Sequence, residues 1–378
     1  MTARAEIVVD LAAVRHNVAL LRELAGVPVM AVVKADGYGH GAVRVARAAR
    51  AAGAEWLAVA TLDEARALRE AGDTGPLLAW LTVPGERYDD VLAAGVDVTA
   101  YSVAQLDEIA AAAARLPEAT ASARVQLKVD TGLARGGAPR AEWPAFFARA
   151  RAGETDGSWR VTGLWSHLAC ADEPDHPAND AQQAAFDEAV DHAVDAGLEP
   201  GLRHLANSAA TLLRPQARYD AVRVGLACYG LDPAPGVDHG TDLRPAMTVT
   251  SRLALVKHLA AGDSVSYGHQ WTASAPTTVG LVPLGYGDGV PVAATNVAEV
   301  VVEGKRRPVR GRVCMDQVLV DLGGDTPPAG TEVTLLGPPG DGRPTADDWA
   351  RACGTINYEI VTRLGGQVGR TSRRYVGG

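Results

Sequence analysis

Residues 27–71 read VPVMAVVKADGYGHGAVRVARAARAAGAEWLAVATLDEARALREA, and this stretch sets the expected fold. An apolar run, Val27–Lys34, precedes an Ala- and Arg-rich segment, Ala42–Ala52, and the same order returns in Glu55–Ala60 and Leu62–Ala71. Short apolar runs bounded by turn residues are typical of buried strands, and the longer segments between them are typical of helices. Two strand–helix units in succession favour parallel strands joined by helices.

The alternation continues through the first two thirds of the chain. Further strands are expected at Leu77–Thr82, Val96–Thr99, Arg124–Val129, Arg160–His167, Leu202–Leu205 and Ala221–Leu226, with further helices at Val103–Arg115 and Asp180–Ala196. Capping boxes at Thr61-x-x-Glu64 and Ser102-x-x-Gln105 mark two helix starts. Eight such units favour a closed (β/α)8 barrel of the TIM type, although the pattern alone leaves an open doubly wound sheet as the alternative.

The pattern changes after Leu231. Residues Asp232–Gly240 form a linker rich in Pro, Gly and His. Runs of β-branched residues follow at Met247–His258, Thr277–Leu284, Glu299–Val302, Gln317–Asp321 and Glu332–Leu336, with a short helix expected at Ala346–Ala352. We therefore expect a barrel domain over residues 1–240 and a mainly antiparallel β domain over residues 241–378.

Composition narrows the function. The net charge of −9 in 378 residues argues against a nucleic-acid partner or an anionic membrane surface, because both favour basic patches. Residues Met1–Asp10 contain no apolar stretch of signal-peptide length, and no run of apolar residues is long enough to span a membrane. The four cysteines are far apart in the sequence, which predicts reduced thiols in a cytoplasmic protein. The nine histidines lack metal-ligand spacing, so we expect no metal.

Polar residues stand where the expected strands end. In a (β/α)8 barrel these ends meet at one mouth, where the active site is formed. The residues are Lys34 after the first strand, Lys128 and Arg135 after the fifth, His167 after the sixth, Asn207 and Ser208 after the seventh, and Arg223 and Gly225 on the eighth. Taken singly, Lys34 is also typical of a solvated strand end and His167 of a buried core histidine. Five strands together predict a catalytic mouth.

The lysines are informative because they are rare. Only Lys34, Lys128, Lys257 and Lys305 occur among 36 basic residues. An amine can form a Schiff base or a carbamate, and a guanidinium does not replace it in that chemistry. Lys257 and Lys305 fall in no motif and are expected at the surface.

One motif is more specific than the rest. Residues 31–41, AVVKADGYGHG, resemble the pyridoxal-phosphate attachment site of the alanine racemases, and other family motifs follow in order over nearly the whole chain. They are Lys128-x-Asp130-Thr131-Gly132-x-x-Arg135, Ser166-His167, His204-x-x-Asn207-Ser208, Val222-Arg223-x-Gly225, Ser266-Tyr267-Gly268, Gly285-Tyr286-x-Asp288-Gly289, Arg312-Val313-Cys314-Met315-Asp316-Gln317 and Asn357-Tyr358-Glu359. The ordered set is far more specific than any single motif.

The resemblance implies an isomerase that interconverts L- and D-alanine, supplies D-alanine for peptidoglycan and acts as a cytoplasmic head-to-tail homodimer. An amino-acid α-hydrogen is too weakly acidic for a side-chain base alone, and pyridoxal phosphate supplies the electron sink. The implied catalysts are Lys34, which also holds the cofactor as a Schiff base, and Tyr267 from the partner subunit, assisted by His167 and Arg223. Free tyrosine titrates near 10, so the phenol needs the help of His167 to act as a base.

Further roles follow from the same resemblance. The implied cofactor-binding residues are Lys34, Tyr38, His167, Asn207, Ser208, Arg223, Gly225, Leu226 and Tyr358. Arg135 and the backbone N–H of Met315 are implied to bind the substrate carboxylate. Lys128 is implied to carry a carbamate that orients Arg135, since two neighbouring cations would repel. The implied substrate entrance consists of Asp172, Tyr286, Arg312 and Ile356.

The sequence departs from the family at one point and leaves three alternatives open. Many relatives carry an arginine just after the Gly-Tyr-x-Asp-Gly turn, where this chain has Val290-Pro291-Val292-Ala293. This change puts the electrostatics of the entrance in doubt. The alternatives are a racemase for another small amino acid such as serine, a barrel-type pyridoxal-phosphate decarboxylase, and a non-catalytic carrier of the cofactor. Arg223 argues against the decarboxylase, which would place a carboxylate there, and Tyr267 argues against the carrier.

Overall fold

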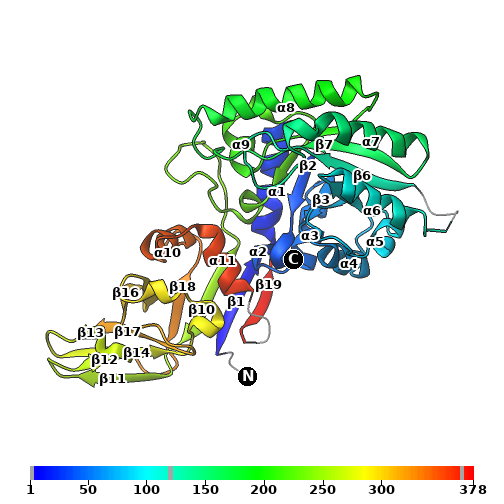
Figure 1. Cartoon of the computed structure of the whole chain (residues 1–378). Helices are drawn as coiled ribbons and strands as arrows, with labels where there is room; N and C mark the ends of the chain where they lie inside the picture. The colour runs from blue at the N-terminus through cyan, green and yellow to red at the C-terminus, as the bar shows by residue number, and fades with distance from the viewer. Residues whose placement is uncertain (1–3, 118–121, 367–369) are drawn as a thin grey trace.

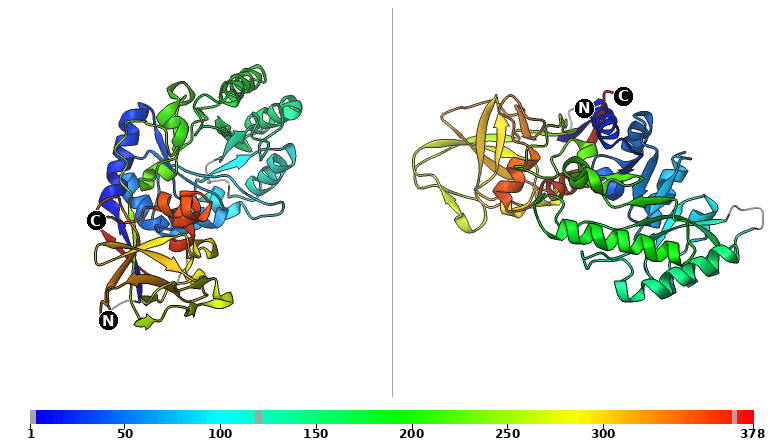
Figure 2. Two further views of the ribbon diagram at one scale, coloured as in Figure 1. Left: turned by 90° about the vertical axis from the view of Figure 1, so that its left-hand side faces the viewer. Right: turned by 90° about the horizontal axis from the view of Figure 1, so that it is seen from above.

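The computed structural model describes residues 4–117, 122–366 and 370–378. The chain forms a helix-covered barrel and, beside it, a second body built mainly of strands (Figure 1). Both views in Figure 2 keep the yellow-to-orange strands of the second body outside the barrel. Within the described ranges, no helix combines the length and the apolar character needed to cross a membrane.

The barrel contains eight parallel strands, one for each strand expected from the sequence. In spatial order they are β8 (Leu202–His204), β7 (Trp159–Trp165), β6 (Ala123–Lys128), β5 (Asp97–Ala100), β4 (Leu77–Ala79), β3 (Trp56–Val59), β2 (Val29–Val32) and β9 (Val222–Val224). Strands β2, β3, β4, β5 and β9 are buried along their whole length, as expected where helices cover one face and the barrel core fills the other.

The barrel is nearly closed between its two edge strands. The N–H of Arg223 donates to the carbonyl of Ala206 at 2.9 Å, and the N–H of Asp220 donates to the carbonyl of Arg203 at 3.0 Å. These two bonds join the ends of β8 and β9, which do not pair with each other as strands. The (β/α)8 prediction is therefore confirmed, and the open-sheet alternative is wrong.

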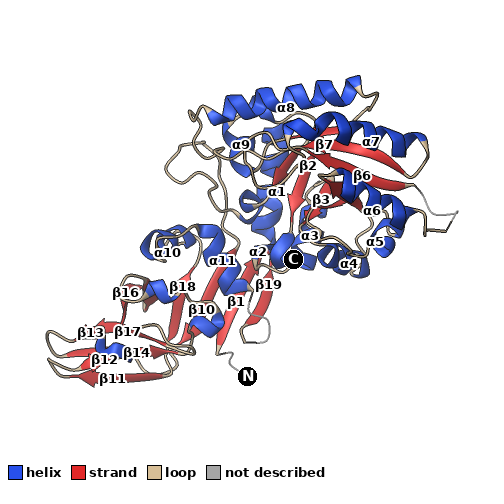
Figure 3. Ribbon diagram, viewed as in Figure 1, coloured by secondary structure: helices blue, strands red, loops and turns tan. Residues whose placement is uncertain are grey.

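Helices lie outside the strands (Figure 3). They are α1 (Leu11–Ala25), the short turn α2 (Lys34–Tyr38), α3 (Ala42–Ala51), α4 (Leu62–Glu70), α5 (Asp89–Ala93), α6 (Val103–Ala113), α7 (Trp143–Thr155), α8 (Ala178–Asp195) and α9 (Ser208–Leu213). The expected capping box at Thr61 and Glu64 is present in both directions, which explains why α4 begins at Leu62.

The second body is a nine-stranded, mostly antiparallel sheet, as the sequence predicted. Its order is β11 (Leu255–Leu259), β14 (Thr277–Val282), β17 (Val318–Gly323), β16 (Lys305–Arg310), β15 (Glu299–Val302), β18 (Glu332–Leu336), β10 (Met247–Arg252), β1 (Ala5–Asp10) and β19 (Ser372–Val376). A two-stranded ribbon, β12 (Ser264–Val265) and β13 (Trp271–Thr272), stands apart. Helices α10 (Ala346–Cys353) and α11 (Asn357–Gly365) complete it.

The N-terminal strand differs from the expectation. The barrel domain was expected to begin at residue 1, whereas β1 pairs antiparallel with β10 and parallel with β19 in the second sheet. Its residues alternate between buried and half-buried, which is the period-two pattern of a sheet with two unlike faces. Six residues ahead of the first barrel helix are too few to reveal such a distant partner. The second body therefore takes strands from both ends of the chain.

Candidate active site

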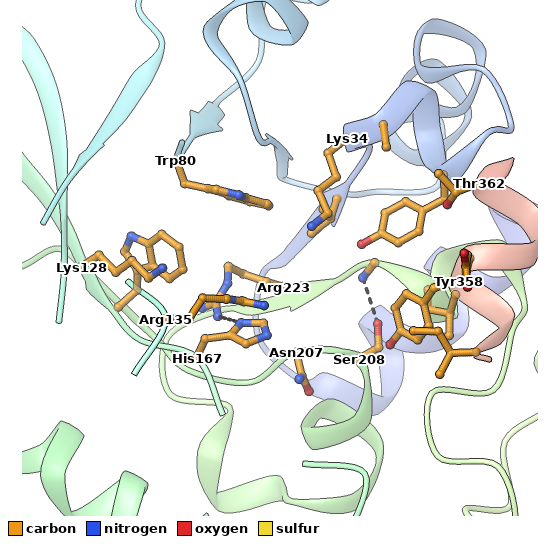
Figure 4. Close-up of a pocket in the computed structure, with 18 of the residues that line it drawn as sticks. Lys34, Trp80, Lys128, Arg135, His167, Asn207, Ser208, Arg223, Tyr358 and Thr362 are labelled. Atoms are coloured by element: carbon orange, nitrogen blue, oxygen red, sulfur yellow. Dashed lines mark hydrogen bonds between the residues drawn. The ribbon is translucent and has the colours of Figure 1, made fainter. Parts of the chain in front are cut away.

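A cavity of about 530 Å³ opens where the barrel strands end (Figure 4). Twelve of the residues singled out from the sequence line this cavity: Lys34, Tyr38, Lys128, Arg135, His167, Asn207, Ser208, Arg223, Gly225, Leu226, Ile356 and Tyr358. They come from five barrel strands and from α11, which reaches over the mouth from the second body. The convergence predicted from strand ends is confirmed.

Lys34 is positioned by an unusual turn. Ala35, Asp36 and Tyr38 all have φ near 52°, and Gly37 between them and Gly39 after them also have positive φ. Each non-glycine residue in this left-handed conformation costs about 1–2 kcal/mol, so other contacts must hold the turn. The carboxylate of Asp36 accepts from the N–H of Ala42 at 2.8 Å and forms an ion pair with Arg373 at 2.8 Å. The turn places both Lys34 and Tyr38 in the cavity.

The cavity is strongly cationic. Burial lowers the pKa of the Lys34 amine, and Arg135 lowers it further. Burial, Arg223 and Arg135 lower the pKa of Lys128 to about 8. A lysine with a lowered pKa spends more time as the neutral amine, which can accept a proton or attack a carbonyl carbon. The arrangement therefore favours nucleophilic and general-base chemistry and the binding of anions.

Arg223 determines the state of two histidines. Its Nη2 lies 3.2 Å from Nδ1 of His167, and its Nη1 lies 2.8 Å from Nδ1 of His204. A guanidinium only donates, so both Nδ1 atoms must accept, and each neutral ring must carry its proton on Nε2. Burial and Arg223 hold the pKa of each imidazole well below its usual value, so both rings are neutral. His167 thus offers an Nε2–H donor at the cavity wall.

The opposite end of the cavity suits a phosphate. Oγ of Ser208 accepts from the N–H of Gly225 at 2.9 Å, which leaves the hydroxyl proton of Ser208 to donate to a ligand. A Cβ on Gly225 would lie 2.4 Å from the hydroxyl of Tyr38, so only glycine permits this close approach. Burial and then Asp172 raise the pKa of Tyr358 to about 12, which keeps that hydroxyl a donor. Hydroxyl donors, a buried amine and Arg223 fit an aldehyde that carries a phosphate and an aromatic nitrogen.

A second group of predicted residues lies elsewhere. Tyr267 is on a short 3₁₀ turn beside β13 and is 70% exposed, and Met315 is 52% exposed. Neither they nor Tyr286 and Arg312 line the cavity of their own chain. Hydrogen bonds join these segments: the backbone N–H of Gly287 donates to the carbonyl of Met315 at 2.8 Å, and the side-chain hydroxyl of Ser266 donates to the carbonyl of Arg312. The structure thus gathers Tyr267, Tyr286, Arg312 and Met315 into one loop group, apart from Lys34.

The loop group is also conformationally strained. Ser266 has φ 65° and ψ −178°, a region that is almost confined to glycine. Such a residue costs about 1–3 kcal/mol and persists only where its surroundings fix it. Here the bond from Ser266 to Arg312 and the nearby Sγ of Cys314, 3.3 Å from the Ser266 hydroxyl, fix the turn. The strain lies directly before Tyr267.

Sequence reasoning missed several contributors to the cavity. Trp80 and Trp165 form an aromatic wall whose ring centroids are 6.0 Å apart, and Nζ of Lys34 lies 5.6 Å from the centre of Trp80. Glu64 accepts from the N–H of Ala35 and so anchors the left-handed turn. Strand-end position was an available signal for Trp80 and Trp165. The role of Glu64 was hidden because its capping box already explained it.

Comparison with known proteins gives consistent matches over the whole length. Residues 9–233 match the family "Alanine racemase, N-terminal domain", and residues 246–372 match "Alanine racemase, C-terminal domain". The chain is 51% identical over 374 residues to the alanine racemase of Salinispora arenicola, covering 99% of both chains, and 52% identical over 371 residues to that of Thermobifida fusca, covering 98% of both.

Solved structures agree with these matches. The alanine racemase from a D-cycloserine-producing Streptomyces lavendulae superposes with a TM-score of 0.96 at 47% identity, covering 100% of this chain and 98% of that one. The alanine racemase of Streptomyces coelicolor gives 0.95 at 50% identity, covering 99% and 98%. The alanine racemase of Bacillus anthracis, solved with bound L-Ala-P, gives 0.89 at 34% identity, covering 100% and 97%.

Proposed function

This chain belongs to the alanine racemase family, and from that premise we propose how its own residues interconvert L- and D-alanine. Full-length identity of about one half to alanine racemases carries the activity itself. The observation that carries the assignment of residues is the cavity, because it joins Lys34, Arg135, His167, Ser208 and Arg223 in one space. The relatives reported above at about half identity are alanine racemases, not decarboxylases or carrier proteins.

The cofactor of the proposal is pyridoxal phosphate. Lys34 would hold its aldehyde carbon, Ser208, Tyr38 and Tyr358 would lie at its phosphate end, and Arg223 would face its ring nitrogen. When bound, it supplies an electron sink for the carbon that loses a proton. Burial lowers the pKa of Arg223 to about 9, still above neutrality, so the guanidinium stays a donor and would keep that ring nitrogen unprotonated. His167 and Asn207, with the backbone at Gly225 and Leu226, would complete the binding site.

Racemisation needs a base on each face of the α-carbon. Nζ of Lys34, as the neutral amine, would take or return the proton on the D-alanine face. The hydroxyl oxygen of Tyr267 would do so on the L-alanine face. A phenol needs stabilisation of its anion to act near neutrality, and the Nε2–H of His167 is the donor that the Arg223 bond leaves available.

The two bases can meet only if subunits share their sites. Tyr267 lies outside the cavity of its own chain, in the exposed loop group of the second body. We therefore propose a head-to-tail homodimer in which this loop group completes the cavity of the partner. Tyr267 and Met315, which are exposed in the single chain, would then be buried in that interface.

The remaining roles concern the substrate carboxylate and its path. Arg135 and the backbone N–H of Met315 would bind the carboxylate. Lys128, with its pKa near 8, would react as the neutral amine with carbon dioxide: a nitrogen–carbon bond forms, a proton leaves to water, and the resulting carbamate would pair with Arg135. Ile356 at the cavity and Asp172, whose charge acts on Tyr358, would form the entrance with Tyr286 and Arg312 from the partner. The enzyme would act in the cytoplasm and supply D-alanine for peptidoglycan.

The direct test is an assay of the purified protein. Incubation with L-alanine should yield D-alanine, and the reverse reaction should approach the same equal mixture. Parallel incubation with L-serine tests the alternative of another small substrate. A higher kcat/KM for serine than for alanine would contradict the assignment of alanine as the main substrate.

A further inference from the structure

A chain of hydrogen bonds runs from Arg223 down through the interior of the barrel. Nη1 of Arg223 lies 2.8 Å from Nδ1 of His204, and Nε2 of His204 lies 2.8 Å from Oε1 of Gln126. Nε2 of Gln126 then donates to the carboxylate of Asp97 at 3.2 Å. His204, Gln126 and Asp97 are completely buried, and none of the three lines the cavity.

The direction of each bond follows from its neighbours. Arg223 has only donors, so Nδ1 of His204 accepts and Nε2 carries the proton. That proton needs an acceptor, because a buried unpaired N–H is costly. Gln126 supplies one only while its oxygen faces His204. The carboxylate of Asp97 has only acceptors, so it fixes the amide nitrogen of Gln126 on its own side.

Asp97 is held as an acceptor from several directions. The guanidinium of Arg124 and the hydroxyl of Thr162 both donate to its carboxylate, besides Gln126. Its side chain is fully buried, while that of Arg124 is 31% exposed on the far side of the barrel. The donors around Asp97 therefore require two oxygens there and leave no place for an amide nitrogen.

We propose that Asp97 and Gln126 are positioning residues that hold the proton of His204 on Nε2, so that Nδ1 stays available to accept from Arg223 and fix its guanidinium at the cavity. The comparison with His167 is instructive. Both histidines accept from Arg223 at Nδ1, but among the residues that the structure describes only His204 continues through Nε2 into a further chain of hydrogen bonds. His167 keeps its Nε2–H for the reacting groups, whereas the Nε2–H of His204 serves the position of Arg223.

The tautomer of His204 does not depend on the proposed reaction, and only its effect on catalysis rests on the proposed function. The first measurement therefore needs no turnover. NMR of the holoenzyme enriched in ¹⁵N-histidine distinguishes a protonated from an unprotonated ring nitrogen, and loss of signals in His204→Gln assigns the residue. We expect one form only, with the proton on Nε2, between about pH 6 and pH 9. A proton on Nδ1, or a mixture of both forms, overturns the proposal.

Two variants test whether Asp97 and Gln126 hold the proton of His204 on Nε2. In Asp97→Asn, the orientation that puts the amide nitrogen at the position of Oδ2 presents a donor to Gln126 and favours inversion of the Gln126 amide, which would put a donor against Nε2 of His204. We expect a second set of signals with the proton on Nδ1, a fall in kcat of about tenfold and a KM within about twofold of the wild type. In Gln126→Met, the Nε2 proton loses its acceptor, so its NMR signal should move upfield and exchange faster with water, with a similar fall in kcat.

Thr162→Val is the matched control. It removes another buried donor to the same carboxylate, at nearly constant volume, without touching Gln126 or His204. It should retain the wild-type tautomer and a kcat within about twofold, even where stability falls. Wild-type tautomer signals and kcat in both Asp97→Asn and Gln126→Met would refute the positioning role. Absence of racemisation in a wild type with the expected tautomer would instead refute the proposed function alone.

Discussion

At the barrel mouth, Lys34 lies in a cavity where burial and Arg135 lower the pKa of its amine, whereas Tyr267 is 70% exposed on a loop of the second body. Both residues adjoin backbone in an uncommon conformation: a left-handed turn after Lys34 and strained Ser266 before Tyr267. Contacts within one chain therefore set the pKa of the amine at the mouth. Contacts within one chain also fix the backbone of the loop, but they leave the side chain of Tyr267 exposed. Under the proposed function, the mouth of each chain would hold the cofactor and one base, and its loop would supply the second base to another copy.

Removal of Lys34 should have the largest effect on this division. In Lys34→Ala the mouth loses both its amine base and the proposed cofactor linkage, so racemisation should fall by about 10⁴-fold or more. Steady-state assays in both directions measure the loss. Borohydride reduction of the wild type should label a peptide that contains Lys34, with Lys34→Arg as the unlabelled control. Labelling at Lys128, Lys257 or Lys305 instead would contradict the assignment.

Tyr267→Phe should have the next largest effect, because it removes the phenol from the loop and keeps the ring. Racemisation should fall by about 10²–10⁴-fold in both directions. Exchange with solvent should become unequal: in deuterated water the variant should still exchange the α-hydrogen of D-alanine through Lys34 and hardly that of L-alanine. Mass spectrometry of each enantiomer measures the exchange. Equal residual exchange would mean that one base reaches both faces.

Mixing the two inactive variants tests whether the loop completes another subunit. Dissociation and reassociation of Lys34→Ala with Tyr267→Phe should give hybrids in which one site has both native bases, about one quarter of all sites for random pairing. Activity should return toward that fraction, while each variant alone stays inactive. Full activity of a wild-type monomer in sedimentation would rule out the shared site.

Much of the fold and of the candidate site was predictable from the sequence. Strand–helix alternation predicted the barrel and its mouth, because parallel strands bring residues such as Lys34, His167 and Arg223 to one end whatever the details of the loops. The left-handed turn at Ala35 and Asp36 was not predictable, because neither residue favours positive φ and contacts with Glu64, Ala42 and Arg373 stabilise it. The position of β1 was equally hidden, since its partners lie more than two hundred residues away.

A smaller effect is expected from loss of the proposed carbamate on Lys128, which tests how charge at the mouth positions Arg135. Removal of dissolved carbon dioxide should lower activity by about tenfold if the carbamate orients Arg135. Recovery after bicarbonate is added needs the neutral amine. Because the pKa of Lys128 is lowered to about 8, the neutral fraction, and with it the recovery rate at a fixed concentration of dissolved carbon dioxide, should rise with pH up to and through about 8. Stopped assays after degassing measure both. Lys257→Ala, a surface control, should leave the response unchanged, and an activity insensitive to carbon dioxide would exclude the carbamate.

The smallest effects are expected on the free energy of unfolding when glycine replaces a residue of positive φ. Such substitutions distinguish the role of the strained turn after Lys34 from that of the strained residue before Tyr267. Ala35→Gly places glycine where φ is 52° at an exposed side chain, so relief of about 1–2 kcal/mol should exceed the entropic cost of glycine and raise the free energy of unfolding slightly. Ser266→Gly relieves about 1–3 kcal/mol but deletes the hydroxyl that donates to the carbonyl of Arg312, worth about 1 kcal/mol, so the net change should be near zero or modestly stabilising. Urea unfolding measures both variants, with Ala52→Gly at a position of negative φ as a destabilising control.

The two variants should differ more in kcat than in stability. Ala35→Gly keeps the contacts of Asp36 that hold the turn and should keep kcat within about twofold, whereas Ser266→Gly frees the backbone next to Tyr267 and should reduce kcat several-fold, because a displaced base loses rate steeply. If Ser266→Gly leaves kcat unchanged while Ala35→Gly lowers it, then strain positions the base at the mouth rather than the base on the loop.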